Sequence, residues 1–294
     1  MNNLLKRASA ATASAVLLGG LAVTSTSTAN AAATAACSMS VGSITAGGDI
    51  ANTGVTASSP IKSTRGAGPH LFGPGLSKIA STWTTTVGVA GEDTTYGEVV
   101  VNGTLYSGEY GHDSTGKPTS SLKSEGVGYQ GYKVVESSFY FGKTVRGASY
   151  RLRGDGVLYR FGDKRQVTRY TGYSAVKTMA LISETQTYDT FLALTNGGAL
   201  YTIHIPTSTA APTVKKVRTS TWQSFDFLVA EKCGAQSTLL TAIDKDSGSA
   251  YLYAVGHANG LSTVIQGLGK VPGTFTDPVY YLQTAEGNPS LFGE

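Results

Sequence analysis

Two carboxylates and one amine stand at the same place in a repeated sequence pattern. Glu136, Lys177 and Asp226 each follow, by four residues, an aromatic residue that opens a strand-like stretch. If these stretches are the innermost strands of a ring of sheets, the three side chains project toward a central channel. A pair of carboxyl groups roughly 5 to 10 Å apart can act as acid and as base or nucleophile in glycosidic bond cleavage. The same groups can equally be the polar lining that a water-filled channel needs.

The aromatic residues of this pattern form a second candidate site. Each follows a small or hydroxylated residue, and the five are Trp83, Tyr132, Tyr173, Trp222 and Phe275. An exposed ring offers an apolar face to the aliphatic C–H face of a sugar, while neighbouring polar groups orient the hydroxyls. The other interpretation is that each ring is a wedge packed between adjacent sheets. Trp83 and Trp222 are the two rings for which exposure is expected.

The spacing of these aromatic residues predicts the architecture that positions them. Consecutive copies lie 41 to 53 residues apart, as in a repeat fold whose unit is a few short strands. Tight-turn dipeptides such as Asn102-Gly103 and Asp155-Gly156 lie between the strand-like stretches, so each unit is expected to be strand, turn, strand. A second repeat interleaves with the first and reads GTLYSG from Gly103, GVLYRF from Gly156, GALYTI from Gly198 and AYLYAV from Ala250. The chain is therefore predicted to be all-β.

Both repeats together resemble a known family. The segments GYKVV at Gly131, GYSAV at Gly172 and TWQSF at Thr221, each followed later by the leucine-tyrosine repeat, are similar to the blade repeat of tachylectin-type five-bladed propeller lectins. Family blades carry a regular tryptophan, which this chain keeps only at Trp83 and Trp222. The resemblance implies a five-bladed β-propeller with pockets between blades that bind N-acetylated sugars. Several weak pockets of this kind would combine into high avidity.

Three segments are expected along the chain. Residues 1–36 combine Lys6 and Arg7, an apolar run from Ala15 to Val23 and small-residue cleavage points, which is typical of a secretory signal peptide. Residues 37–68 are expected to be an N-terminal arm or a closing strand, and residues 69–294 to be the propeller. Because the last unit is short of strands, pairing of the N- and C-terminal strands would close the ring and remove its exposed edges.

The two cysteines are expected to form a disulfide. Cys37 and Cys233 are the whole cysteine complement, and an exported protein meets an oxidising compartment in which two thiols tend to pair. The alternative is that Cys37 is a lipidated N-terminus. The residues before it, Thr34-Ala35-Ala36, lack the usual aliphatic residue, which favours the disulfide.

Charge and motif content exclude several classes of partner. Loss of Lys6 and Arg7 with the signal peptide lowers the formal net charge from +4 to +2, which is far from the basic stripe of a nucleic-acid binder. No apolar stretch approaches the roughly 20 residues of a membrane-spanning helix. Asp244, Asp246 and Gly248 resemble the start of a calcium loop but lack its glycine and closing glutamate, so neither a metal nor a cofactor is expected.

The sequence therefore predicts a secreted binding module whose partners are glycans or a cell-surface polymer. The ligand-binding residues would be the five repeated aromatics, and the protein is expected not to be an enzyme. One alternative is a glycoside hydrolase that uses Glu136 and Asp226 in the central channel. Another is a non-catalytic propeller that binds other proteins.

Overall fold

The computed structural model describes residues 37–162, 166–208, 210–287 and 290–294, and these form an all-β protein. They contain strands β1 to β21 and one turn of 3-10 helix, η2 (Gly260–Ser262), with no α-helix among them. The all-β prediction is thus confirmed. The expected signal peptide, residues 1–36, lies outside the described residues. No helix in the described part of the chain is long and apolar enough to cross a membrane.

The strands form one large sheet and three smaller sheets. The large sheet has nine strands, in the order β3 (Lys62–His70), β2 (Asp49–Thr56), β1 (Ser38–Ile44), β21 (Val279–Ala285), β5 (Trp83–Val87), β6 (Asp93–Val101), β7 (Thr104–His112) and β8 (Pro118–Val127), with β4 (Ser77–Ala80) paired to β6. The second sheet contains β9 (Tyr132–Phe141), β10 (Val145–Arg153), β11 (Leu158–Phe161) and β12 (Val167–Tyr170). The third contains β13 (Val176–Glu184), β14 (Tyr188–Thr195), β15 (Leu200–Pro206) and β16 (Thr213–Arg218). The fourth contains β17 (Phe227–Lys232), β18 (Thr238–Asp244), β19 (Ser249–Val255) and β20 (Ile265–Val271).

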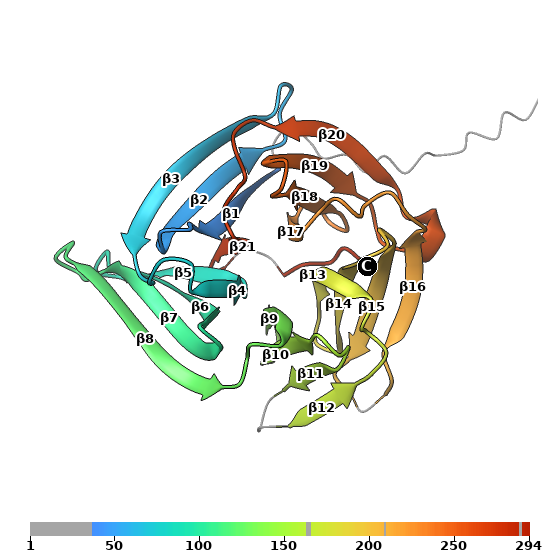
Figure 1. The fold of residues 1–294 in the computed structure, drawn as a ribbon, viewed down its shortest axis with the longest axis horizontal. Helices are drawn as coiled ribbons and strands as arrows, with labels where there is room; N and C mark the ends of the chain where they lie inside the picture. The colour runs from blue at the N-terminus through green and yellow to red at the C-terminus, as the bar shows by residue number, and fades with distance from the viewer. Residues whose placement is uncertain (1–36, 163–165, 209, 288–289) are drawn as a thin grey trace, which may run out of the picture.

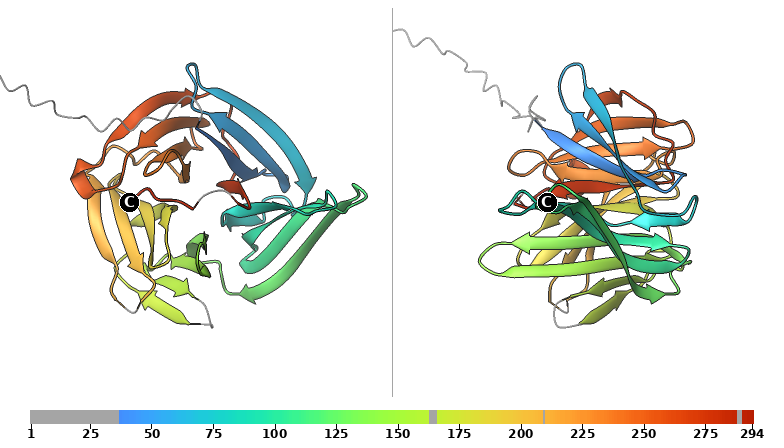
Figure 2. Two further views of the ribbon diagram at one scale, coloured as in Figure 1. Left: turned by 180° about the vertical axis from the view of Figure 1, so that it is seen from behind. Right: turned by 90° about the vertical axis from the view of Figure 1, so that its left-hand side faces the viewer.

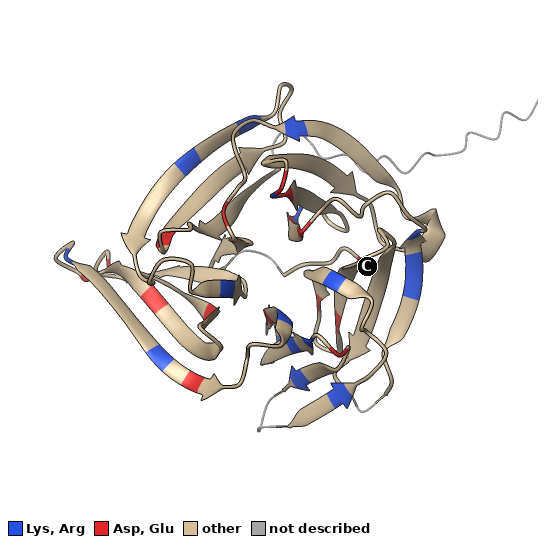
Figure 3. Cartoon of the chain, in the orientation of Figure 1, with Lys and Arg blue, Asp and Glu red and all other residues tan. Residues whose placement is uncertain are grey.

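These sheets are arranged as a ring around a central space (Figure 1). Strands β21, β4, β9, β13 and β17 lie nearest the centre, and β3, β8, β12, β16 and β20 lie on the outside. In the side view the strands of successive sheets run across the thickness of the disc (Figure 2). Charged residues occur both on the outer strands and around the centre (Figure 3).

The first and the last strand of the described chain meet in the large sheet. Strand β1 pairs antiparallel with β21 from Ser40↔Gln283 to Ile44↔Val279, which is the pairing expected of the N- and C-terminal strands. Strand β21 also pairs in parallel with β5, from Gln283↔Trp83 to Ala285↔Thr85. The segment expected to be an arm or a single closing strand contributes three strands, β1, β2 and β3. Strands β2 and β3 contain Gly, Asp, Asn and Pro residues, which are depleted in strands and therefore weaken the local strand signal.

A two-residue turn joins β6 to β7 as the sequence predicts. Asn102 and Gly103 have φ angles of 48° and 74°, the left-handed values that a hairpin turn of this length needs. The turn makes Leu105 and Tyr106 the start of an outgoing strand, in register with Val100 and Val99. Local turn chemistry therefore sets the strand register that places the rest of the repeat.

The core lies in separate layers between neighbouring sheets. The layer between the third and fourth sheets contains Leu192, Leu194 and Leu240 at 0% exposure. The layer between the second and third sheets contains Leu158 and Phe191, also at 0%. The third sheet therefore buries both faces against its neighbours in the ring, and its strand β14 carries the continuous apolar run Phe191 to Leu194 instead of strict alternation.

One buried ion pair crosses the layer between the second and third sheets. Asp189 on β14 is 0% exposed and accepts hydrogen bonds from Arg146 Nη2 at 2.6 Å and from Arg146 Nη1 at 2.9 Å. It also accepts from the Ser138 hydroxyl at 2.6 Å and the Tyr150 hydroxyl at 2.5 Å. Arg146 in turn donates to the carbonyl oxygens of two residues in the β13–β14 hairpin, at 2.6 and 2.9 Å. The charges are thus hydrogen-bonded on all sides, as a buried pair requires.

A disulfide joins Cys37 to Cys233, as predicted, with the Cα atoms 5.6 Å apart. Cys37 immediately precedes β1, and Cys233 immediately follows β17. The bond therefore ties the N-terminal strand to the innermost strand of the fourth sheet. Because its sulfur is bonded to Cys233, Cys37 is not a lipid attachment site in this structure.

Candidate functional site

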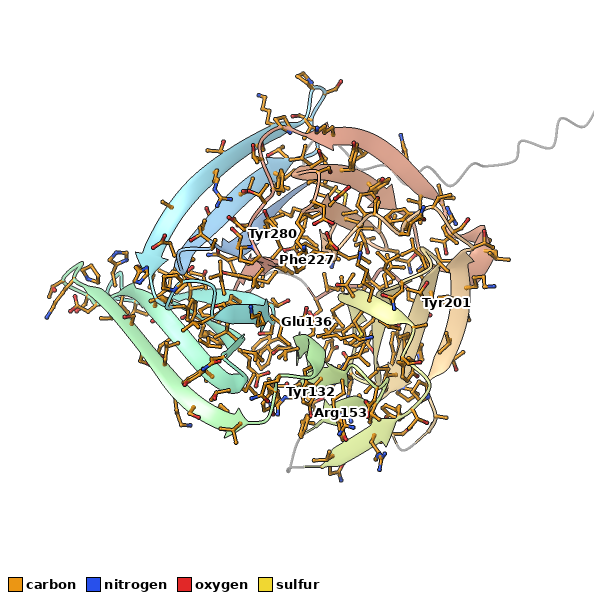
Figure 4. All side chains as sticks on the ribbon, viewed as in Figure 1. Tyr132, Glu136, Arg153, Tyr201, Phe227 and Tyr280 are labelled. Atoms are coloured by element: carbon orange, nitrogen blue, oxygen red, sulfur yellow. A yellow bond between two sulfur atoms is a disulfide. The ribbon has the colours of Figure 1, made fainter. Side chains whose placement is uncertain are left out.

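A cavity of about 720 Å³ occupies the centre of the ring. Glu136 on β9, Lys177 on β13 and Asp226, just before β17, all line it. The structure thus brings together the three residues that the repeat pattern placed around one channel. Figure 4 shows Glu136 and Phe227 near the centre of the ring, on opposite sides of it. The cavity is the first candidate functional site.

Lys177 and Asp226 form an ion pair between the third and fourth sheets. Lys177 Nζ lies 2.9 Å from Asp226 Oδ1, and the two side chains are 28% and 16% exposed. Lys177 Nζ also donates to the Gln223 carbonyl oxygen at 3.3 Å, and Asp226 Oδ2 accepts from the Lys245 amide at 3.2 Å. The pair presents one cation and one carboxylate to the cavity in a fixed position.

Glu136 is held in a different environment. Its Oε1 accepts from the Thr82 amide at 2.7 Å and from the Ser137 amide at 2.8 Å. Burial outweighs these two hydrogen bonds and raises the pKa of Glu136 to about 7. Near neutral pH the carboxyl is therefore present in both protonated and ionised forms, so it can donate as well as accept a hydrogen bond.

Further glutamates of the cavity wall, among them Glu184 and Glu231, escaped the sequence reasoning. Glu184, at the end of β13, accepts from the Phe139 amide at 2.9 Å, and burial raises its pKa to about 7. Glu231 on β17 is 8% exposed, accepts from the Lys232 amide at 2.9 Å and binds the Thr284 hydroxyl at 3.3 Å. Both line the cavity. Their spacing from the repeated aromatic differs from that of Glu136, so only their place on the same inner strands could have indicated them.

These carboxylates have a structural role as well as a chemical one. Glu136 reaches from β9 to the segment before β5, and Glu184 reaches from β13 to β9. Asp226 binds β13 through Lys177, and Glu231 binds β21 through Thr284. Each link joins segments at the inner edge of the ring that belong to different inner strands or lie next to them. A substitution in the cavity wall must therefore keep hydrogen-bonding capacity if its effect on ligand binding is to be separated from an effect on folding.

The stability of the protein is predicted to depend on pH through Glu136. Because its folded pKa of about 7 exceeds the ordinary value of 4.5, its contribution is fully present below pH 4.5 and is lost as the pH rises through 7. Glu136→Gln keeps the acceptor oxygen and removes the titration. Between pH 4.5 and 7, the free energy of unfolding of the variant should therefore rise relative to that of the wild type by up to about 1.4 kcal/mol per pH unit. Urea unfolding at pH 5 and pH 8 measures this, and an equal difference at both values would contradict it.

Three of the five repeated aromatics are buried. Trp83 is 0% exposed, Phe275 1% and Trp222 6%, so the expectation that Trp83 and Trp222 are exposed is wrong. Trp83 packs between Tyr110 and Tyr281, with ring centroids 5.8 Å from each. Trp222 packs on Phe225 and Tyr253. Trp222 and Phe275 lie in the layers between neighbouring sheets, whereas Trp83 packs between strands of the large sheet itself. The physical reason is the same in each place, because a large ring buries more apolar surface there than it could on the rim.

Tyr132 and Tyr173 are partly exposed, and Tyr132 lines a recess. The recess has a volume of about 400 Å³ and is bounded by Tyr132, Arg153, Asp155 and the backbone of three glycines. We call it the Tyr132 notch. Tyr132 also packs on Tyr129 with centroids 4.7 Å apart, and Arg153 forms an ion pair with Asp155. Tyr173 instead packs against the core layer between the second and third sheets.

No cluster of three or more metal-ligating side chains is present in the described part of the chain. Asp244, which begins the calcium-like segment, accepts from the Ser247 amide at 3.1 Å and closes a turn. No protein-family model matches the chain, and a search of curated proteins finds no match either.

Proposed function

We propose that this chain is an exported carbohydrate-binding protein with a five-bladed β-propeller architecture, and that the sugar binds in the central cavity. Five groups of strands around one axis support the architecture. Three are the separate four-stranded sheets, and the large sheet supplies two more, β21 with β1 to β3 and β4 with β5 to β8. The pairing of β1 with β21 closes the last group, and the parallel contact of β21 with β5 joins it to the first. The disulfide between Cys37 and Cys233 is compatible with export.

The observation that carries the function is the composition and size of the cavity. Its volume of about 720 Å³ falls in the range of small-ligand sites, and its wall combines apolar side chains with a few fixed polar groups. Phe227 and Phe139 supply aromatic surface, while Glu136 and the Lys177–Asp226 pair supply acceptors and a donor. A sugar needs this combination, because its C–H faces pack on rings and its hydroxyls need directed partners.

This proposal moves the ligand away from the place that the resemblance to tachylectin-type lectins implies. Sites between blades would rely on the repeated aromatics, and Trp83, Trp222 and Phe275 have no ring face free for a sugar. The Tyr132 notch is the remaining candidate of that kind. Five equivalent sites, and the avidity that would follow from them, are therefore not part of the proposal.

The double variant Lys177→Gln with Asp226→Asn tests the cavity as the binding site. It removes both charges together, so no unpaired charge is left, and it keeps polar groups of similar shape. We expect the affinity for the sugar identified on a glycan array to fall about tenfold or more, as loss of charge-assisted hydrogen bonds implies. Isothermal titration calorimetry measures the affinity, and circular dichroism checks that the variant is folded.

Tyr132→Ala is the matched comparison, because it alters the notch and leaves the cavity wall intact. If Tyr132→Ala abolishes binding while the cavity variant binds normally, the sugar lies in the notch and the cavity proposal is wrong. If the wild type binds no glycan at all, the carbohydrate proposal fails. If a hydrolysis screen also finds no activity, a protein-binding role is the remaining interpretation.

A glycoside hydrolase is the second candidate, favoured by the different surroundings of Glu136 and Asp226. Glu136 has a pKa of about 7, as suits an acid, whereas Asp226 is held by a lysine. The two backbone amides bound to Glu136 Oε1 equally suit a structural role. A hydrolysis screen decides between these: loss of a measurable activity in both Glu136→Gln and Asp226→Asn would favour the enzyme.

A further inference from the structure

A protruding aromatic pair lies at the rim of the central cavity. Phe139 and Phe141, near the end of β9, are 57% and 75% exposed, yet both line the cavity wall. Side chains that are both exposed and part of the wall stand where the cavity opens to solvent. Exposed apolar side chains that adjoin one another form a patch of the kind that marks a binding surface.

The two rings lie on one face of the β9–β10 hairpin. Residues two apart on a strand point the same way and are about 6.6 Å apart along it. In the pairing of β9 with β10, Phe139 lies opposite Gly147 and Phe141 lies opposite Val145. A glycine opposite Phe139 leaves that ring uncovered by a cross-strand side chain, and Val145 is itself 54% exposed. The two rings therefore form a short row that leads out of the cavity.

The position of Phe139 is fixed from the cavity side. Its amide donates to Glu184 Oε2 at 2.9 Å, which ties the end of β9 to the end of β13. Glu184 and Glu286 also line the cavity wall. A sugar unit on the Phe139 ring would therefore have the Glu184 carboxyl close to it.

We propose that the ligand is a linear polysaccharide whose chain continues from the central cavity over Phe139 and Phe141. This inference rests on the proposed function, because it assumes that the cavity holds a sugar. Two rings spaced along one strand suit successive units of a chain, and a single monosaccharide would leave them unused. A lipid surface fits the patch less well, because the Glu184 carboxyl accepts from the Phe139 amide and so places an acidic group at this edge of the patch, where it would oppose an anionic membrane.

Length-dependent binding provides the test. The probes are linear N-acetylglucosamine oligomers of one, three and six units, with affinities measured by isothermal titration calorimetry. We expect the wild-type affinity to rise with length. Phe141→Ala should lower the affinity for the six-unit oligomer about tenfold and leave that for the one-unit sugar nearly unchanged. Phe141→Trp, which keeps a ring, should bind the six-unit oligomer as the wild type does.

Leu261→Ala is the matched control, because Leu261 is 68% exposed and lies in η2, outside the cavity wall. It should leave all three affinities unchanged. A wild-type affinity independent of length, or an equal loss for short and long oligomers in Phe141→Ala, overturns the inference while leaving the proposed function intact. Absence of binding at every length overturns both. Sedimentation with phosphatidylcholine–phosphatidylserine vesicles that is lost in Phe141→Ala would assign the patch to a lipid surface and also overturn the inference.

Discussion

Asp189→Ala is expected to destabilise the protein by about 3 to 5 kcal/mol. The substitution leaves the Arg146 guanidinium, whose side chain is 8% exposed, in a buried site without its counterion. It also removes the acceptor of the Ser138 and Tyr150 hydroxyls. Because the network joins the second and third sheets, its loss opens the layer between them. Urea unfolding followed by circular dichroism measures the change in the free energy of unfolding.

Two controls separate the buried pair from charge effects in general. Glu125→Ala breaks the Lys123–Glu125 pair, in which the lysine side chain is 80% exposed, and should cost less than about 1 kcal/mol. Arg146→Met combined with Asp189→Leu removes both charges and should recover part of the lost stability. If Asp189→Ala stays within about 1 kcal/mol of the wild type, the network does not hold the two sheets together.

Trp83→Ala is expected to cost about 3 to 5 kcal/mol, whatever ligand is present. The ring is fully buried and its approach to the backbone depends on two glycines. A Cβ atom at Gly97 would lie 2.5 Å from the ring, and one at Gly108 would lie 2.8 Å from it. Two strands of the same sheet therefore leave space for this one side chain. Truncation leaves a cavity where β5, β6 and β7 meet, which the surrounding sheet can fill only in part.

The same variant separates a structural wedge from a sugar-binding ring. A wedge lowers the midpoint of thermal unfolding and leaves the affinity of the folded protein for its ligand unchanged. Truncation of a sugar-binding ring would instead lower the affinity and leave the thermal midpoint nearly unchanged. Trp83→Phe serves as the control, because it retains most of the apolar surface and should cost markedly less than Trp83→Ala. A thermal midpoint of Trp83→Ala equal to that of the wild type would contradict the wedge role.

Local features of the sequence were enough to predict the fold class and part of the topology. The Asn102-Gly103 turn has the left-handed angles that its residue types favour, and this depends only on adjacent residues. The disulfide was also predictable, because a chain with only Cys37 and Cys233 can form just one internal pair. Equivalent positions in the repeat led to Glu136, Lys177 and Asp226, because repeated strands direct equivalent side chains to the same centre.

Other features of the protein depend on contacts between segments far apart in the sequence, so only the tertiary structure determined them. An aromatic residue at the start of a strand can pack inward or face solvent. Packing against strands distant in the sequence determined that Trp83, Trp222 and Phe275 are buried while Tyr132 borders a recess. The sequences of β21 and β5 contain no local signal that predicts their parallel pairing. The placing of Glu184 and Glu231 in the cavity wall likewise follows from the ring arrangement of the inner strands. Strand periodicity tells which residues share a face, but the packing of sheet on sheet determines what that face meets.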